Sequence, residues 1–159
     1  MPQDKSIFEI GSAFGRDANF MESLGYKVNR SDAASSFVNY LHEQGSSCQL
    51  FNALKDDLSD STFAVFASAV FLHFTKHELE NVLKRMYAKF DDGGLLAFSV
   101  KCGIGQEWEN EKLGRKRLFC YWQPNELQNL LSKFNFEILY LEQDEEQKWI
   151  YIIAKKNNL

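Results

Sequence analysis

The sequence predicts an α/β domain with a doubly wound, three-layer sandwich and a mostly parallel sheet of seven strands, the last of them antiparallel. Three observations support this fold class. Apolar runs alternate with segments of helical periodicity from residue 7 onward. The run at 63–70 is apolar throughout, as in a central parallel strand covered by helices on both faces. The last two apolar runs, 136–142 and 149–154, flank a polar turn and predict an antiparallel hairpin.

Composition excludes several classes of protein. With 159 residues, 45% of them hydrophobic, the chain suffices for one domain with a full core. A net charge of −4 argues against binding nucleic acid through bulk electrostatics. The cysteines (Cys48, Cys102 and Cys120) are odd in number and lack a CxxC pair, so we expect no disulfide framework, no metal site and a reducing cytoplasmic location. No run approaches the roughly 20 apolar residues of a membrane span, and the N-terminus lacks a signal-peptide core, so we expect neither a membrane partner nor export.

The first junction passes from a strand at 7–10 into a helix through two glycines. Gly11 and Gly15 allow backbone conformations and close ligand approach that a Cβ atom would obstruct. The helix that follows presents unpaired amides to whatever lies in the crevice. Alone, the pattern describes an ordinary strand-to-helix loop equally well, because short glycine patterns recur by chance.

The first helix is expected to begin near Asp17, which would cap it, and to stop at Gly25. Its predicted apolar face consists of Ala18, Phe20, Met21 and Leu24. A second strand at 26–32 ends in Asp32, about 20 positions after the glycine turn. In nucleotide-binding sheets an acidic residue at that spacing accepts hydrogen bonds from a ribose diol. The alternative makes Asp32 the cap of the next helix.

That next helix is predicted at 34–43, followed by a strand at 47–51 and a polar loop at 52–62. His73 follows the central strand directly, and a lone histidine there is either structural or a proton acceptor. A capping box at Thr75 and Glu78 opens a long amphipathic helix that ends near Phe90.

The third quarter of the chain continues with a turn at 91–94 and a strand at 95–100. Residues 101–122 look irregular, and a loop of that length usually serves a function. Their distinctive residues are Gly103, Gly105 and Gly114 and the basic cluster of Lys112, Arg115, Lys116 and Arg117. Pro124 then opens the last helix.

Six segments, taken together and in order, resemble class I S-adenosylmethionine-dependent methyltransferases. They are FEIGSAFGRDANFMESLGY, VNRSDAASSF, FAVFASAVFLHF, DDGGLLAFSVKCG, RLFCYWQPNELQNLL and WIYIIAKK. The resemblance covers nearly the whole chain and is nearest to a small bacterial group in which Arg-Asp follows the glycine loop. It implies one Rossmann-like domain over residues 1–159, S-adenosylmethionine as cofactor with S-adenosylhomocysteine as product, and methyl transfer to an unidentified acceptor, either a small molecule or a macromolecule.

The resemblance also implies a set of cofactor-binding residues. They are Glu9, Gly11, Ser12, Ala13, Gly15, Arg16, Asp32, Ala33, Asn52, Ala53, Ser68 and Ala69. Glu9 and the glycine loop would line the pocket for the methionine part. Arg16 would contact a carboxylate or the backbone, or else form a surface salt bridge. Asp32 would bind the ribose, 52–53 the adenine edge, and 68–69 would lie beside the methyl group.

Around the acceptor, the resemblance implies fewer roles. His73 matches a histidine often present in the group and is the candidate catalytic base. An aromatic wall around the acceptor would come from Phe119, Tyr121 and Trp122, although aromatics at such a junction are also common in cores.

The sequence departs from the family pattern at several positions. Relatives commonly carry glycine at Ala13, aspartate at Asn52 and Ala64, and proline at Asp92. They also carry a helical segment before the first strand, which here begins by about Ser6. We therefore expect a domain without that cover helix: either the chain is a truncated form, or its crevice holds the cofactor unusually open.

These departures motivate a second hypothesis, a non-catalytic relative that binds S-adenosylmethionine or a partner without methylating anything. A dinucleotide-dependent oxidoreductase is disfavoured, because GxGxxG is not present: position 13 is alanine, and Gly11 and Gly15 are four positions apart.

Overall fold

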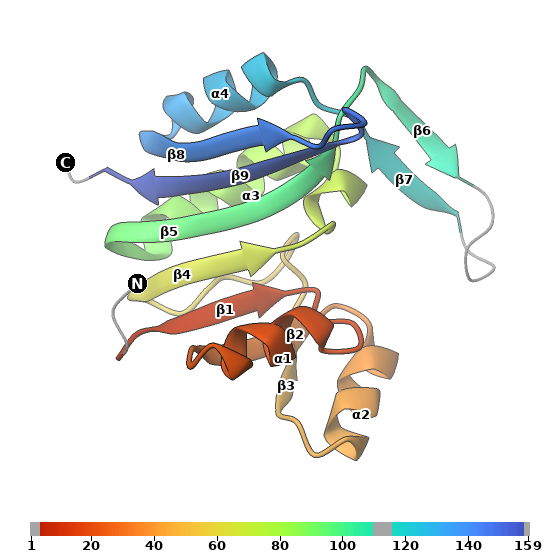
Figure 1. The fold of residues 1–159 in the computed structure, drawn as a ribbon, viewed down its shortest axis with the longest axis vertical. Helices are drawn as coiled ribbons and strands as arrows, with labels where there is room; N and C mark the ends of the chain where they lie inside the picture. The colour runs from red at the N-terminus through yellow and green to blue at the C-terminus, as the bar shows by residue number, and fades with distance from the viewer. Residues whose placement is uncertain (1–3, 110–115, 158–159) are drawn as a thin grey trace.

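The computed structural model describes residues 4–109 and 116–157 and shows a three-layer α/β sandwich (Figure 1). Its seven-stranded sheet has the order β3-β2-β1-β4-β5-β9-β8. The first five strands, which pair in parallel, are β1 (Ser6–Ile10), β2 (Lys27–Asp32), β3 (Cys48–Leu50), β4 (Thr62–Ala67) and β5 (Phe90–Lys101). β9 (Trp149–Lys156) lies antiparallel between β5 and β8 (Phe136–Gln143). The predicted fold class is confirmed.

Helices lie on both faces of the sheet (Figure 1). The helices are α1 (Arg16–Ser23), α2 (Ser35–Glu43), α3 (Lys76–Lys89) and α4 (Pro124–Lys133), and η1 (Phe71–His73) is a single 3₁₀ turn. In Figure 1, α3 lies behind the strands and α1 in front of them. The predicted capping box begins α3: the Glu78 amide donates to Thr75 Oγ1 at 3.2 Å, and the Thr75 amide donates to the Glu78 carboxylate at 2.8 Å. Of the helices in the described ranges, none has the length and apolarity to cross a bilayer.

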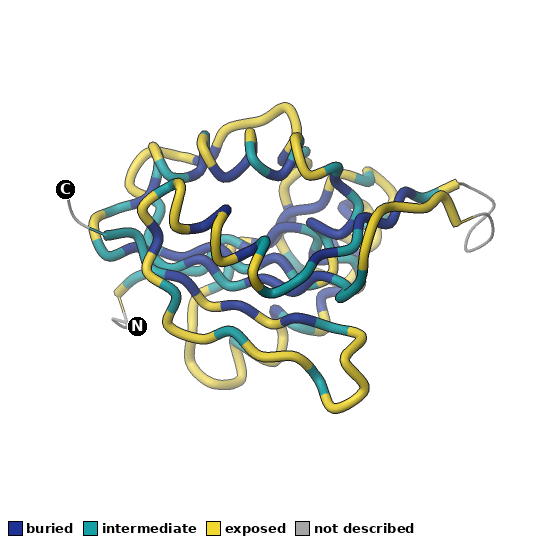
Figure 2. Tube along the Cα trace, turned by 90° about the horizontal axis from the view of Figure 1, so that it is seen from above, coloured by how far each residue is buried: buried dark blue, intermediate teal, exposed yellow. Residues whose placement is uncertain are grey.

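The two faces of the sheet are buried to different degrees. Successive side chains along a strand point to opposite faces, so neighbouring residues report on each face. Phe98, which pairs with Ala67 and Ile152, belongs to the main core against α3 and α4. The adjacent Ala97 pairs with Phe66 and with Ile153, whose side chain is 39% exposed. Figure 2 shows the buried residues concentrated along the strands. The opposite face therefore leaves apolar surface open over β5, β9 and β8.

The predicted apolar face of α1 is wrong. Phe20 and Leu24 are 64% and 60% exposed, and within α1 only Ala18 is buried. A polar contact holds the helix instead: the buried Arg30 guanidinium on β2 donates to both Glu22 carboxylate oxygens, at 2.8 and 2.7 Å. The helix cap is Gly15 rather than Asp17, which lies in the first turn.

The prediction of an irregular segment at 101–122 is also wrong. β6 (Gln106–Glu109) and β7 (Arg117–Cys120) form an antiparallel hairpin that projects beyond the sheet (Figure 1). All of β6 is exposed, so its sequence has no alternation that would reveal a strand. Of the predicted basic cluster, Lys112 and Arg115 lie outside the described residues, as does Gly114. The expected turn at 91–94 belongs to β5, whose pairing with β4 shifts register between Thr62 and Ala64.

Candidate functional site

The loop after β1 is bound to the end of β2 through its backbone. The amides of Gly11 and Ser12 both donate to the Ser31 carbonyl, at 2.9 and 2.8 Å. The Ala13 amide donates to Asp32 Oδ2 at 2.9 Å. Three successive amides thus position the loop at the carboxyl edge of the parallel strands, where open α/β sheets bind ligands.

The same loop also lies against the segment after β4. Gly11 has a φ of +78°, and a Cβ atom added there would lie 2.5 Å from Val70 Cγ2. This position therefore requires glycine, both for its backbone conformation and for the space available. Ala13 also adopts a left-handed backbone conformation, with a φ of 46°.

These contacts enclose a crevice of about 310 Å³, which we call the loop crevice. It is lined by Gly11, Ser12, Ala13, Phe14, Arg16, Asp17, Ser68 and Ala69. All but two of these are in the predicted site set. The additions are Phe14, whose 65% exposed ring packs edge-on against Phe37 and Tyr40 of α2, and Asp17, which had been assigned to the helix cap.

Several predicted site residues do not line the loop crevice. Glu9 is 2% exposed and accepts a hydrogen bond from the Ser12 hydroxyl, and its burial raises the pKa of its carboxyl. Gly15 lies under α2, because a Cβ there would approach Leu41 to 2.9 Å. Ala33 is exposed beside the end of β2.

The two residues assigned to the adenine edge form hydrogen bonds to other parts of the chain. The side-chain oxygen of Asn52 accepts from the Leu54 amide at 3.0 Å, so it closes a turn of its own loop. Ala53 is buried in the core, and its carbonyl accepts from Arg85. The side chain that we expected to recognise adenine is thus folded back on the chain.

Asp32 is buried, with 7% of its surface exposed, and both its carboxylate oxygens are already bonded. Oδ2 accepts from the Ala13 amide and Oδ1 from the Ala34 amide, each at 2.9 Å. It is not the cap of α2, because that position is Ala34. Each carboxylate oxygen accepts more than one hydrogen bond, so Asp32 keeps acceptor capacity while it holds the loop.

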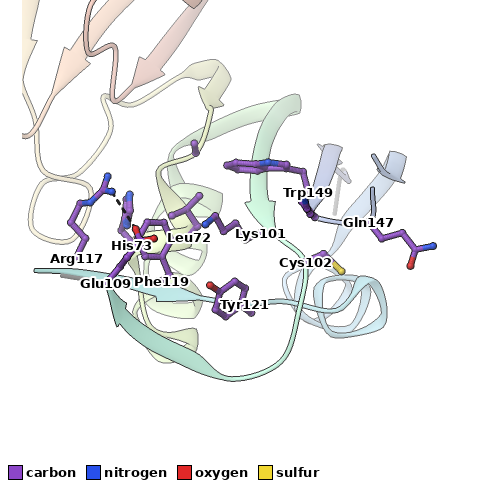
Figure 3. Close-up of a pocket in the computed structure, with 12 residues that line it drawn as sticks. Leu72, His73, Lys101, Cys102, Glu109, Arg117, Phe119, Tyr121, Gln147 and Trp149 are labelled. Atoms are coloured by element: carbon purple, nitrogen blue, oxygen red, sulfur yellow. Dashed lines mark hydrogen bonds and ion pairs between the residues drawn. The ribbon is translucent and has the colours of Figure 1, made fainter. Parts of the chain in front are cut away.

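A second cavity, of about 610 Å³, adjoins the loop crevice, and Ala69 lines both. We call it the hairpin cavity, because β6 and β7 form one of its walls. The cavity is lined by residues of η1, the end of β5, the hairpin and the start of β9 (Figure 3). The Ala69 amide donates to Ser99 Oγ at 3.0 Å, which fixes the junction between the two spaces.

His73 lines the hairpin cavity with its tautomer determined by a backbone contact. Its Nδ1 lies 2.8 Å from the Leu118 carbonyl oxygen, which only accepts, so Nδ1 carries the proton and Nε2 carries the lone pair. Burial lowers the pKa of His73 and, with the charges of Arg117 and Lys101, outweighs the bond to Leu118, which acts to raise it. The ring is therefore neutral at pH 7 and able to accept a proton.

The predicted aromatic wall is formed by a different set of residues. Phe119 and Tyr121 line the hairpin cavity, but Trp122 is 3% exposed and belongs to the core. Trp149 takes its place, opposite Lys101 in the register of β5 and β9. The sequence signal for Trp149 was only its position at the start of the last strand, because the pairing that brings it to Lys101 spans nearly fifty residues of chain.

The sequence matches no family profile and no curated protein. Its fold matches solved structures closely. A methyltransferase dependent on S-adenosylmethionine from Methanosarcina mazei superposes with a TM-score of 0.85 at 17% identity, over 100% of this chain and 95% of that one. One from Mesorhizobium loti gives 0.76 at 14% identity, over 98% and 94%.

A third similar structure contains ligands. The 1,6-didemethyltoxoflavin-N1-methyltransferase of Burkholderia thailandensis, with 1,6-didemethyltoxoflavin and S-adenosylhomocysteine bound, gives a TM-score of 0.72 at 16% identity, over 97% of this chain and 72% of that one. At these identities the comparisons establish the architecture. The chain has the Rossmann-like fold of class I S-adenosylmethionine-dependent methyltransferases.

Proposed function

We propose that this protein is a methyltransferase that uses S-adenosylmethionine, with the cofactor in the loop crevice and the acceptor in the hairpin cavity. The observation that carries the proposal is that Ala69 lines both spaces. In-line methyl transfer requires donor and acceptor to meet at one point, and enzymes gain most of their advantage from that alignment. We further place the protein in the cytoplasm and in the small bacterial group with Arg-Asp after the glycine loop.

The residues of the loop crevice fit the amino-acid end of the cofactor. Gly11 lets the loop pack directly against Val70 in the segment after β4, which places the glycine loop beside Ser68 and Ala69 in one crevice. Arg16, with 87% of its side chain exposed, pairs with the neighbouring Asp17 at 2.9 Å, and on binding it would exchange that contact for the cofactor's carboxylate beside the positive end of α1. Asp17 provides the opposite charge for an ammonium group.

The remaining parts of the cofactor would be held less directly. The free acceptor capacity of Asp32 suits the two ribose hydroxyls, and the exposed Ala33 suits one face of a purine. The roles of Glu9, Ser12 and Gly15 are then to shape the loop, and Asn52 and Ala53 fix the shape of the segment after β3 through their own hydrogen bonds. Bound S-adenosylmethionine supplies an electrophilic methyl group on a sulfonium.

His73 is the residue that we assign to proton transfer. The acceptor's lone pair forms the new bond to carbon while the carbon–sulfur pair stays on sulfur, leaving S-adenosylhomocysteine. Nε2 of His73 takes any proton that the acceptor releases, because Nδ1 is held protonated by the Leu118 carbonyl. The depressed pKa of His73 keeps Nε2 available at neutral pH.

Calorimetric titration with S-adenosylmethionine and S-adenosylhomocysteine tests the proposal. We expect both to bind one site, and Arg16→Gln to weaken binding. Lys84→Gln, on the exposed surface of α3, is the matched control and should bind as the wild type does. Failure of both compounds to bind a folded protein would remove the proposal, and binding without turnover of any acceptor would favour the non-catalytic relative.

A further inference from the structure

The size, charge and aromatic lining of the hairpin cavity indicate which class of acceptor it binds. We propose that the acceptor is a small planar aromatic compound with one carboxylate, and that Lys101 binds that carboxylate. This inference rests on the proposed function, because it names the class of molecule that occupies the cavity adjoining the cofactor.

Size is the first argument. The hairpin cavity, at about 610 Å³, lies in the middle of the roughly 300–1,000 Å³ that pockets for small molecules occupy. Its walls come from separate segments that surround the space, rather than from one flat face (Figure 3). A protein or nucleic-acid acceptor would require an extended surface, so the cavity favours a compact molecule.

Charge is the second argument. The whole chain has a net charge of −4, yet the lining of this cavity carries Lys101, Arg117 and Lys148 against the single carboxylate of Glu109. Glu109 pairs with Arg117 at 3.5 Å, and Glu146 pairs with Lys148 at 2.5 Å.

Lys101 differs from these two cations. Across residues 4–109 and 116–157 it forms no ion pair, and its ammonium lies 4.3 Å from the centre of the Phe119 ring. The hydroxyl of Tyr121 donates to Glu107, a bond that raises the pKa of Tyr121 to about 12, so this phenol adds no charge at pH 7. The Glu107 carboxylate that accepts this bond adds a negative charge beside the cavity, but Lys101 is still the lining cation that forms no ion pair within the described residues, and one bound carboxylate would give it a partner.

Ring faces around Lys101 are the third argument. Trp149 lies directly opposite Lys101 in the antiparallel register, and in Figure 3 Trp149 and Tyr121 lie on opposite sides of the Lys101 side chain. Tyr121 packs closely on Gly103, where an added Cβ would lie 3.1 Å from the ring. An aromatic ring bound between such walls gains stacking energy as well as burial.

The test uses the full chain saturated with S-adenosylhomocysteine and three matched pairs of probes. The probes are benzoate, 4-hydroxybenzoate and 2-aminobenzoate, each beside its neutral amide. We expect at least one carboxylate to bind tenfold or more tightly than its amide. Lys101→Gln should abolish that preference, and Lys101→Arg should restore part of it.

Lys133→Gln is the matched control, because Lys133 also lies over an aromatic ring, that of Phe134 at 5.8 Å, but on α4 outside the cavity. It should keep the wild-type preference. The proposed acceptor class is wrong if no carboxylate binds the protein saturated with S-adenosylhomocysteine, or if the amides bind as tightly as the carboxylates. It is also wrong if Lys101→Gln still prefers the carboxylate over its amide. The comparison of carboxylate with amide in the wild type holds even if a variant fails to fold. Failure of S-adenosylhomocysteine itself to bind is a separate result, which overturns the proposed function.

Discussion

The loop crevice and the hairpin cavity adjoin at Ala69, but they are built from different parts of the chain. Six of the eight residues that line the loop crevice lie between Gly11 and Asp17, and hydrogen bonds to β2 hold this loop in place. The hairpin cavity is formed by side chains from η1, β5, β7 and β9, which are distant in sequence. The difference indicates that cofactor geometry is set locally, whereas acceptor chemistry depends on how distant segments meet.

The largest expected effect concerns the hairpin cavity alone. His73→Gln should lower kcat for methyl transfer to the acceptor by about 10²–10⁴-fold, the usual contribution of a positioned general base. The dissociation constant for S-adenosylmethionine, measured by calorimetry, should not change. A variant with full kcat would show that His73 only supports the hairpin through Leu118.

The same variant tests the depressed pKa of His73 without any acceptor. The unfolded chain binds a proton near the ordinary histidine value of about 6.5, but the folded chain binds it only at lower pH. The free energy of unfolding should therefore fall as pH drops below about 6.5, by up to about 1.4 kcal/mol per pH unit, and level off below the folded pKa. Denaturant titrations at several pH values should show that the free energy of unfolding of His73→Gln does not fall in this way, whereas that of the wild type does.

Next in size is a change in the loop crevice. Gly11→Ala should destabilise the fold by about 2–5 kcal/mol, because the left-handed backbone costs about 1–2 and the contact with Val70 about 1–3. Gly25→Ala is the matched control: its φ is +88° but a Cβ there meets nothing within 4 Å. In the same denaturant titration, Gly25→Ala should lose only the stability that the left-handed backbone costs. If Gly11→Ala and Gly25→Ala lose equal stability, Val70 moves aside to accept the added Cβ atom.

Asp32→Ala should weaken S-adenosylmethionine binding by about 1.5–3 kcal/mol, roughly 10–150-fold, through the loss of charged hydrogen bonds. It should also lower stability, because the Ala13 and Ala34 amides lose their acceptor. Asp32→Asn, which keeps one acceptor oxygen, should lose less of both. Unchanged affinity in folded Asp32→Ala would restrict its role to holding the loop.

The smallest effect is expected for Ala13→Gly. Glycine relieves a left-handed residue at φ 46°, and its own unfolded-state entropy offsets part of that gain, leaving about 0.5–1 kcal/mol of added stability. Ser61→Gly, at φ 61° in the loop before β4, should give a similar gain in thermal unfolding. Only Ala13→Gly should also tighten cofactor binding.

Much of the architecture follows from local patterns in the sequence. The capping box of Thr75 and Glu78, the unbroken apolar run of β4 and the final hairpin were all predictable, because each depends on neighbours within a few residues. The glycine loop and the end of β2 were expected at one edge, because parallel strands place their carboxyl ends together.

Tertiary structure decided the rest. Helical spacing predicts that Phe20 and Leu24 are buried, but the contact between Arg30 and Glu22 holds α1 with both exposed. A pattern of residue types does not reveal that Asp32 is buried and bonded on both oxygens.

The residues that line the hairpin cavity could not be predicted from the sequence either. Trp149 faces Lys101 only through the register of β5 and β9, and Arg117 reaches the cavity only because β7 pairs with β6. The sequence by itself therefore determined the fold and the location of the loop crevice, since both arise from local periodicity and backbone geometry. The side chains that line the hairpin cavity were set by long-range strand pairing, which local periodicity does not encode.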